Sequence, residues 1–166
     1  MALDTTIGGA ASDSYITLAE WQTYWTARGV DLTAHGHDSS HEANLRQAAD
    51  WIDRNYRFVG YKQYQTQARA WPRITDHLID GWPINADTLP QAVKDAQAEL
   101  AYLIHEGLTP WATIDGGVAS TRVKAGPVES ETTFAGQKAP PRLVAIEGLL
   151  RDYIGGGSAY QVRASR

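Results

Sequence analysis

The stretch HGHDSSH, residues 35–41, groups the side chains of this sequence that are best suited to hold a metal ion. Imidazole and carboxylate groups are common zinc ligands, so His35, His37, Asp38 and His41 could form such a site. The first two histidines, however, fall in a loop rich in Gly, Asp and Ser, and His41 falls in the first turn of an expected helix. No second cluster of ligands accompanies them in the sequence. We therefore expect a solvated loop, with no metal and no other cofactor.

Paired carboxylates are the other candidates for chemistry. Glu129 and Glu131 stand two residues apart in an expected strand, which places them on one face, as a general acid and base would need. That strand carries too little apolar surface to bury them and shift a pKa. Asp50 and Asp53 are expected to be ordinary outward-facing charges of a helix. Neither pair predicts catalysis.

Other enzyme motifs are absent from the sequence. There is no cysteine, no glycine-rich phosphate loop that ends in Lys-Ser or Lys-Thr, and no Gly-x-Ser-x-Gly segment. The net charge of −4 gives no general attraction to nucleic acid or to an anionic membrane. No apolar run approaches the roughly 20 residues of a membrane span. We predict a protein that is not an enzyme and has no membrane partner, with residues 1–14 as a mobile lead-in.

Aromatic and basic residues alternate in NYRFVGYKQYQTQARAWPR, residues 55–73, which contains four basic side chains and no acidic one. Two interpretations are open. The aromatic rings could stack on the bases of a single DNA strand. Alternatively, they could pack over the helices while the Arg and Lys stems cover them, which we favour. Burial decides between the two, because a stacking ring must be exposed to solvent.

Four helices are expected, and they would make the chain mainly α. Three begin with the spacing of a capping box, in which two side chains satisfy backbone N–H groups that would otherwise lack partners. The three pairs are Thr17 with Glu20, Ser39 with Glu42, and Thr88 with Gln91. The fourth helix begins near Pro141, which suits a first helical turn. Apolar residues with helical spacing should form the inward faces, and they are Leu18, Trp21, Tyr24, Trp25, Leu45, Ala48, Ala49, Ile52, Leu89, Val93, Ala96, Leu100, Leu103, Leu143, Ile146, Leu149, Leu150 and Tyr153.

The region between the third and fourth helices favours a β-hairpin. Residues 118–124 and 127–134 are rich in β-forming types and flank the turn signal KAGP. A two-stranded ribbon with so few large apolar residues is marginal alone and needs something to pair with. The predicted fold is therefore a mainly α, small four-helix bundle with a projecting β-hairpin and an extended C-terminal arm. The helical domain would span residues 1–154 with the hairpin inserted at about 117–135, and residues 155–166 would be the arm.

Two Trp-Pro pairs lie close together between the second and third helices. Proline fixes its own φ and biases the preceding residue toward extended geometry. We expect this segment to cross the helices as a stiffened connection with both indoles pinned against them. Its structural anchors are Trp71, Pro72, Arg73, Trp82 and Pro83.

Several blocks occur in a characteristic order: SYITLAEWQTYWTARG, EANLRQAADWIDRNYRFVGYK, QARAWPR with DGWPI, and LPQAVKDAQAELAYLI, followed by VKAGPVESE and a Leu-rich helix. In this order they resemble the head–tail adaptor proteins of tailed bacteriophages, also called head-completion or connector proteins. The resemblance is to the subset described as DnaT-like single-strand DNA-binding proteins. It spans nearly the whole chain, while the His-rich segment and the Gly-rich end depart from it.

The resemblance implies a structural subunit of the virion neck, made in the host cytoplasm. About twelve copies would form a ring under the portal protein, extend the channel for double-stranded DNA, and join the next neck or tail protein, a stopper or tail terminator. The alternative is a single-strand DNA-binding accessory protein, which the acidic net charge disfavours.

The same resemblance, together with the poor apolar content of the hairpin, suggests two contact regions between subunits. An inter-subunit hairpin would use Val118, Arg122, Val123, Lys124, Val128 and Phe134. A portal-docking arm would add as a strand through Tyr160, Gln161, Val162 and Arg163.

Overall fold

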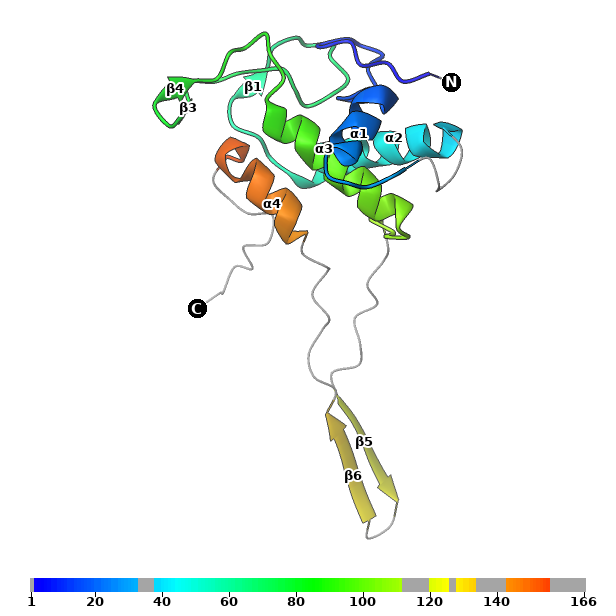
Figure 1. Ribbon diagram of the computed structural model, residues 1–166. Helices are drawn as coiled ribbons and strands as arrows, with labels where there is room; N and C mark the ends of the chain where they lie inside the picture. The colour runs from blue at the N-terminus through cyan, green and yellow to red at the C-terminus, as the bar shows by residue number, and fades with distance from the viewer. Residues whose placement is uncertain (1, 33–37, 112–119, 126–127, 134–142, 156–166) are drawn as a thin grey trace. The chain divides into compact units, whose positions relative to one another are not determined.

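The computed structural model describes residues 2–32, 38–111, 120–125, 128–133 and 143–155. Backbone contacts divide the chain into two units, residues 1–110 with 144–166 and residues 111–143, and each is described by itself. Within the described ranges, the first unit holds four helices and two very small sheets, and the second holds one hairpin (Figure 1). The helices are α1 (Leu18–Thr26), α2 (Asp38–Asn55), α3 (Gln91–His105) and α4 (Val144–Leu150), which continues as a 3₁₀ turn (Arg151–Tyr153). The strands are β1 (Tyr61–Lys62), β2 (Arg73–Ile74), β3 (Leu78–Ile79), β4 (Trp82–Pro83), β5 (Ser120–Ala125) and β6 (Val128–Thr133).

The four predicted helices are present, so the described part of the chain is α-rich, with small antiparallel hairpins added. The packing of the helices as a four-helix bundle stays a prediction. None of the described helices has the length and apolar character that crossing a membrane requires.

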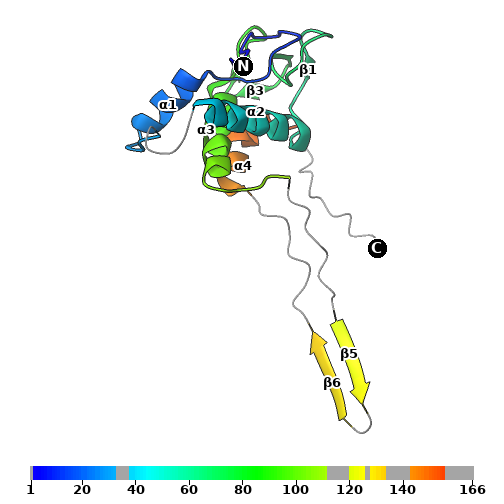
Figure 2. The ribbon, with the colours of Figure 1, turned by 90° about the vertical axis from the view of Figure 1, so that its right-hand side faces the viewer.

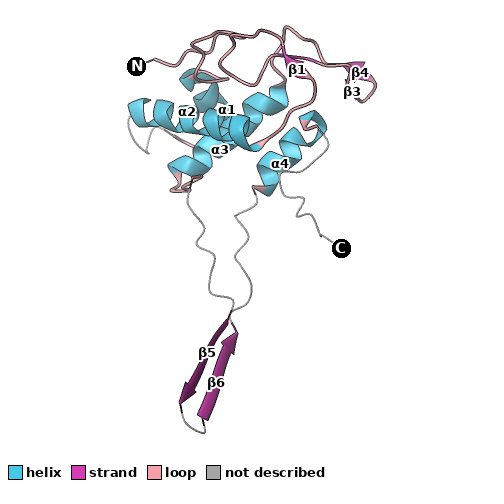
Figure 3. Ribbon diagram, turned by 180° about the vertical axis from the view of Figure 1, so that it is seen from behind, coloured by secondary structure: helices cyan, strands magenta, loops and turns pink. Residues whose placement is uncertain are grey.

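α3 is central to the first unit, since it contacts both α2 and α4 (Figure 3). Its many alanines keep it thin, which lets neighbouring helices approach closely. Val93, Ala96 and Leu100 are fully buried, so this part of the predicted inward stripe is confirmed. α2 buries its whole predicted stripe, Leu45, Ala48, Ala49 and Ile52. Of the stripe predicted for the fourth helix, Ile146 and Leu150 are buried, while Leu143, Leu149 and Tyr153 are only partly covered.

α1 begins with the predicted capping box. Thr17 Oγ1 accepts from the Glu20 N–H at 3.1 Å, and the Glu20 carboxylate accepts from the Thr17 N–H at 2.7 Å. Further along α1, the indole N–H groups of Trp21 and Trp25 both donate to the Ala98 carbonyl of α3, at 2.9 and 3.2 Å. Two bulky indoles therefore connect α1 to α3 and keep the two backbones apart.

The other helix starts differ from the prediction. α2 begins one residue before Ser39, so this serine lies in the first turn rather than at the cap. α3 begins directly after Pro90, which makes no side-chain capping bond. The Thr88 hydroxyl instead donates to the Asn85 carbonyl at 3.1 Å, in the turn that precedes the helix. The predicted start of the fourth helix near Pro141 lies outside the described residues.

The N-terminal segment, expected to be mobile, packs against the helices instead. Gln97 of α3 is fully buried, and its amide nitrogen donates to Ser14 Oγ at 2.7 Å and to the Leu45 carbonyl at 2.8 Å. Its amide oxygen accepts from the Tyr15 N–H at 2.9 Å. A buried amide is costly without partners, so this one fixes the N-terminal segment to α2 and α3.

Residues 56–90, which we call the strap, connect α2 to α3 and contain short strands that the sequence does not predict. β1 pairs with β2, and β3 pairs with β4, both antiparallel. Asp80 and Gly81 join β3 to β4 with φ values of 52° and 84°. Two successive positive φ values are typical of the two-residue turn that suits a tight hairpin, where Asp-Gly is a favoured pair.

Candidate functional site

The metal candidates of the His-rich segment do not form a site in the described residues. His41 is 1% exposed, and its ring centroid lies 5.2 Å from those of Trp21 and His105. It is a core histidine, so the solvation expected for the His-rich segment is wrong for this residue. His35 and His37 lie outside the described residues. In the described ranges, no three His, Asp or Glu side chains are placed to hold a metal ion.

Asp53 and Asp50 were expected to face water. This prediction is wrong for Asp53, whose side chain is 15% exposed beneath the strap, whereas the Asp50 side chain stays 41% exposed. The Asp53 carboxylate accepts from the Tyr15 hydroxyl, from the Ala70 N–H at 3.1 Å and from the Arg69 guanidinium at 3.5 Å. The same guanidinium pairs with Asp50 at 2.7 Å. We call Tyr15, Asp53 and Arg69 the polar node.

The polar node joins the N-terminal segment, α2 and the strap through buried polar side chains. Burial raises the pKa of Asp53, although hydrogen bonds from Tyr15 and the charge of Arg69 oppose the shift. Burial also raises the pKa of Tyr15 well above its ordinary value, and the nearby Asp53 charge adds to that shift. Both side chains are engaged with protein groups from the N-terminal segment, α2 and the strap. The node therefore holds the strap in place.

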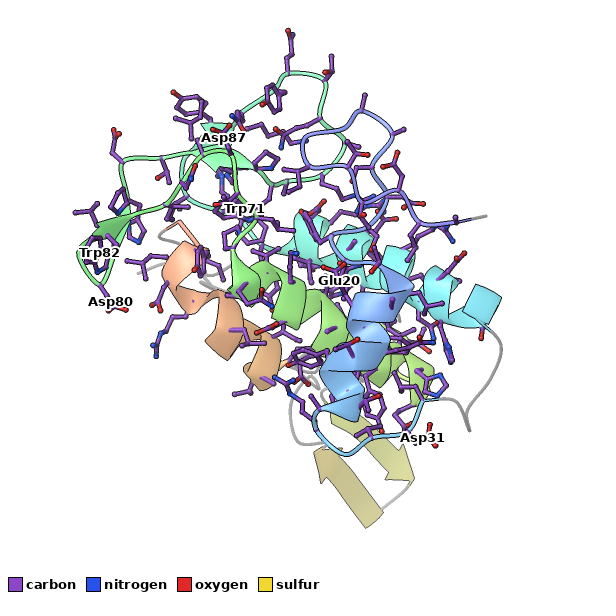
Figure 4. The ribbon with its side chains drawn as sticks, turned by 45° about the horizontal axis from the view of Figure 1, so that its top comes forward. Glu20, Asp31, Trp71, Asp80, Trp82 and Asp87 are labelled. Atoms are coloured by element: carbon purple, nitrogen blue, oxygen red, sulfur yellow. The ribbon has the colours of Figure 1, made fainter. Side chains whose placement is uncertain are left out.

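The two Trp-Pro pairs have different environments. Trp71 is 1% exposed, and its ring lies between those of Phe58 and Tyr153, with centroids at 5.6 and 5.9 Å. Trp82 is 76% exposed, at the outer edge of the strap on β4 (Figure 4). The prediction that both indoles are pinned is therefore wrong for Trp82 and Pro83. The tight turn before β4 reverses the chain, and β4 then pairs with β3 rather than crossing the helices.

Arg73 holds the strap through backbone carbonyls. Its guanidinium donates to the carbonyls of Val59 at 2.7 Å, Gly60 at 2.6 Å and Ala70 at 3.1 Å. Partial burial lowers the pKa of Arg73. Together with the buried Pro72, this side chain fixes the two sides of the strap where β1 meets β2.

The aromatic and basic stretch divides into a buried part and an exposed part. Phe58 and Trp71 belong to the core, as the packing interpretation requires. Tyr61 and Tyr64 are 64% and 47% exposed, as stacking requires. Lys62 lies between the two tyrosines in sequence, and its ammonium donates to a backbone carbonyl of the strap at 3.1 Å. We call Tyr61, Lys62 and Tyr64 the aromatic ledge.

The second unit contains a regular hairpin, and its two strands nearly coincide with the predicted strand ranges. β5 and β6 pair antiparallel, with Arg122 opposite Glu131 and Lys124 opposite Glu129. Opposite charges at facing positions favour an antiparallel ladder. Each of the two acidic residues considered as an acid–base pair thus stands at a register position across from a basic one.

The described residues place no third strand beside β5 or β6. Each strand therefore has an outer edge whose backbone N–H and C=O groups suit pairing with another chain. The other predicted hairpin residues are Val123 opposite Ser130 and Val128 opposite Ala125, while Val118 and Phe134 lie outside the described residues. The predicted arm residues Tyr160, Gln161, Val162 and Arg163 also lie outside them.

Comparison with known families assigns the chain on the basis of its whole length. A family described as "Putative DnaT-like ssDNA binding protein" matches residues 1–166. The chain belongs to this family. No curated protein and no solved structure matches it.

In this DnaT-like chain, the aromatic ledge is the described feature that agrees best with the wording of the family description. Aromatic rings open to solvent and nearby cations are the groups with which proteins bind a single DNA strand, and here Lys62 lies between two exposed tyrosines in the sequence. The family membership fits the resemblance to the DnaT-like subset of adaptor proteins. It leaves the adaptor role itself as a proposal.

Sequence reasoning missed the residues that position these surfaces. Gln97, Tyr15 and Asp53 act through partners more than 35 positions away in the chain. Their local patterns are those of ordinary helix and loop residues. A polar residue within an otherwise apolar stripe, as Gln97 is between Ala96 and Ala98, was the one available signal.

Proposed function

We propose that this DnaT-like chain is a structural head–tail adaptor of a tailed bacteriophage. Copies of it form a ring under the portal protein, extend the channel for double-stranded DNA and join the capsid to the next neck or tail protein. The protein acts without catalysis and is located in the virion neck after synthesis in the host cytoplasm. The helical unit, packed as a four-helix bundle, is the rigid block of this ring.

The observation that carries the proposal is the β5–β6 hairpin. It belongs to a unit of its own, separate from the helical core, and the described residues leave both of its edges open. A ribbon of two six-residue strands gains little stability by itself. Pairing with strands of neighbouring copies would complete it, and such a contact joins different surfaces of each copy, as ring closure requires.

The net charge of the chain also supports the adaptor proposal. The net charge of −4 makes the subunit repel the DNA backbone overall. A conduit benefits from this repulsion, because packaged DNA must slide through without being held. A ring that gripped the phosphates would oppose DNA exit.

Cryo-electron microscopy of the chain mixed with its purified portal protein tests the proposal. We expect an added ring of density at one end of the portal, with the helical unit recognisable in each repeat. A portal that stays bare at a large excess of the chain contradicts the proposal.

A second function has one specific observation in its favour, the aromatic ledge. If the chain is a single-strand DNA-binding protein, a labelled oligonucleotide should bind saturably, and binding should weaken as salt rises. Tyr61→Ala should then reduce affinity by about 1–3 kcal/mol of stacking energy. The control is Tyr24→Ala, which removes a tyrosine of α1 outside the aromatic ledge and should leave the affinity unchanged. Absence of saturable binding in low salt rules this function out.

A further inference from the structure

α1 and α3 leave an open groove between them, with a volume of about 390 Å³. Its lining includes small side chains, Ala19 of α1 and Ala98 of α3, together with Ile16. Next to the groove, the indole N–H groups of Trp21 and Trp25 both donate to the Ala98 carbonyl, so long side chains bridge α1 and α3 there. The methyl groups of these two alanines are too small to fill the space between the helices.

The rim of this groove carries more acid than base. Glu20, at the start of α1 (Figure 4), pairs with Lys94 of α3 at 3.2 Å. Asp95 lines the groove as well, and Glu99 follows one turn later on α3. Arg28 is a second cation near this rim, stacked on an α1 tyrosine with its Cζ 3.4 Å from the ring centroid. Three carboxylates against two cations leave a net charge of −1 in this region.

The chain contains a segment of complementary charge at its C-terminal end. Residues 155–166, GGGSAYQVRASR, carry Arg163 and Arg166 and no acidic side chain, a charge of +2. The whole chain has a charge of −4, so residues 1–154 carry −6. Tyr160 and Val162 give the same segment two side chains that suit a floor of alanines. This segment therefore matches the groove in both polarity and charge.

The segment begins on the side of the helical unit away from the groove. The Gly155 N–H donates to the Arg57 carbonyl at 2.8 Å, and the Val59 N–H donates to the Tyr153 carbonyl at 2.9 Å. These bonds fix the start of the segment beside α4. Figures 1 and 2 show α1 and α4 on different sides of α3. A chain that leaves beside α4 is better placed to enter the groove of another copy than its own.

We infer that residues 156–166 of one copy bind in the α1–α3 groove of a neighbouring copy. The apolar residues of the segment lie on the alanine floor, and its arginines meet the acidic rim. This neighbour replaces the portal as the partner expected for the arm from sequence. The inference rests on the proposed function for the presence of adjacent copies. An arm on one surface and a groove on another form a heterologous contact, which repeats around a ring.

A dye-labelled peptide of residues 155–166 titrated with the full chain tests this contact. We expect saturable binding that weakens severalfold in high salt, because both partners carry exposed charge. Ala19→Arg places a bulky cation in the groove and should weaken binding at least about tenfold. Ala145→Arg, the same change at an exposed position of α4, should leave it unchanged. A peptide with both arginines replaced by Glu should not bind.

Photo-crosslinking identifies which copy is involved. A Tyr160→p-benzoylphenylalanine variant is mixed as ¹⁵N-labelled and unlabelled chains, and crosslinks from it to α1 or α3 should join labelled to unlabelled peptides. Crosslinks confined to one copy, crosslinks to the portal instead, or peptide binding unaffected by Ala19→Arg overturn the inference. Rings on the portal without peptide binding overturn this inference alone. Peptide binding without portal association overturns only the proposed function.

Discussion

At the residue scale, Asp53 becomes a structural residue only because the strap folds over it. Helical spacing places it on the side of α2 that would otherwise face solvent, near Asp50. The strap and the N-terminal segment bring a tyrosine hydroxyl and a backbone N–H to its carboxylate. Burial disfavours the charged form, and this cost exceeds the stabilisation from Tyr15 and Arg69, so the pKa of Asp53 is raised.

The raised pKa makes a prediction about stability and pH. A carboxyl group with a higher pKa in the folded chain binds its proton more tightly when folded. Asp53 therefore contributes stability below its ordinary pKa of 3.8, and that contribution is lost as pH rises through the folded-state pKa. The free energy of unfolding of the natural chain minus that of Asp53→Asn should decrease across this window. Urea unfolding of both chains at a series of pH values measures it, and a difference that stays constant or grows with pH contradicts the assignment.

At the element scale, the strap uses two similar Trp-Pro pairs for different purposes. Trp71 fills the core between aromatic neighbours, whereas Trp82 is displayed on the β3–β4 hairpin. Trp71→Ala should lower the free energy of unfolding by about 3–5 kcal/mol, because it leaves a large cavity. Trp82→Ala should change it by less than about 0.5 kcal/mol, as expected for a surface position. Chemical denaturation of the two variants gives a matched comparison. Equal losses of unfolding free energy would contradict the core position of Trp71 and the surface position of Trp82.

The same strap shows how far sequence reasoning reaches. Periodicity predicts α2 and α3 and their buried stripes, because each stripe depends on residues within one helix. The two Trp-Pro pairs look alike locally, so burial of one and exposure of the other follow only from distant partners such as Tyr153. The sequence left open whether the tyrosines of the aromatic ledge are exposed or buried. For the α1–α3 groove, the only sequence feature was the presence of small residues in both helices. Contacts between elements decide these features, and spacing within one element does not encode them.

At the scale of the whole molecule, we propose a helical unit that is stable by itself and a hairpin that pairs with strands of other copies. Val123→Pro removes a backbone donor from β5 and should disrupt the ladder without affecting the helices. The melting temperature of the helical unit should shift by less than about 2 °C. Ring assembly on the portal should be lost, as seen by electron microscopy. Val123→Thr, which keeps a strand-forming residue, should assemble normally, and assembly by the proline variant would show that the hairpin is dispensable.

The central claim is that this chain binds other protein subunits rather than a single DNA strand. Native mass spectrometry of the chain, offered its portal oligomer and a single-stranded oligonucleotide together, tests that choice in one sample. The account predicts portal particles heavier by multiples of 18.2 kDa, with the oligonucleotide left unbound. A bare portal beside complexes of the chain with the oligonucleotide would contradict it.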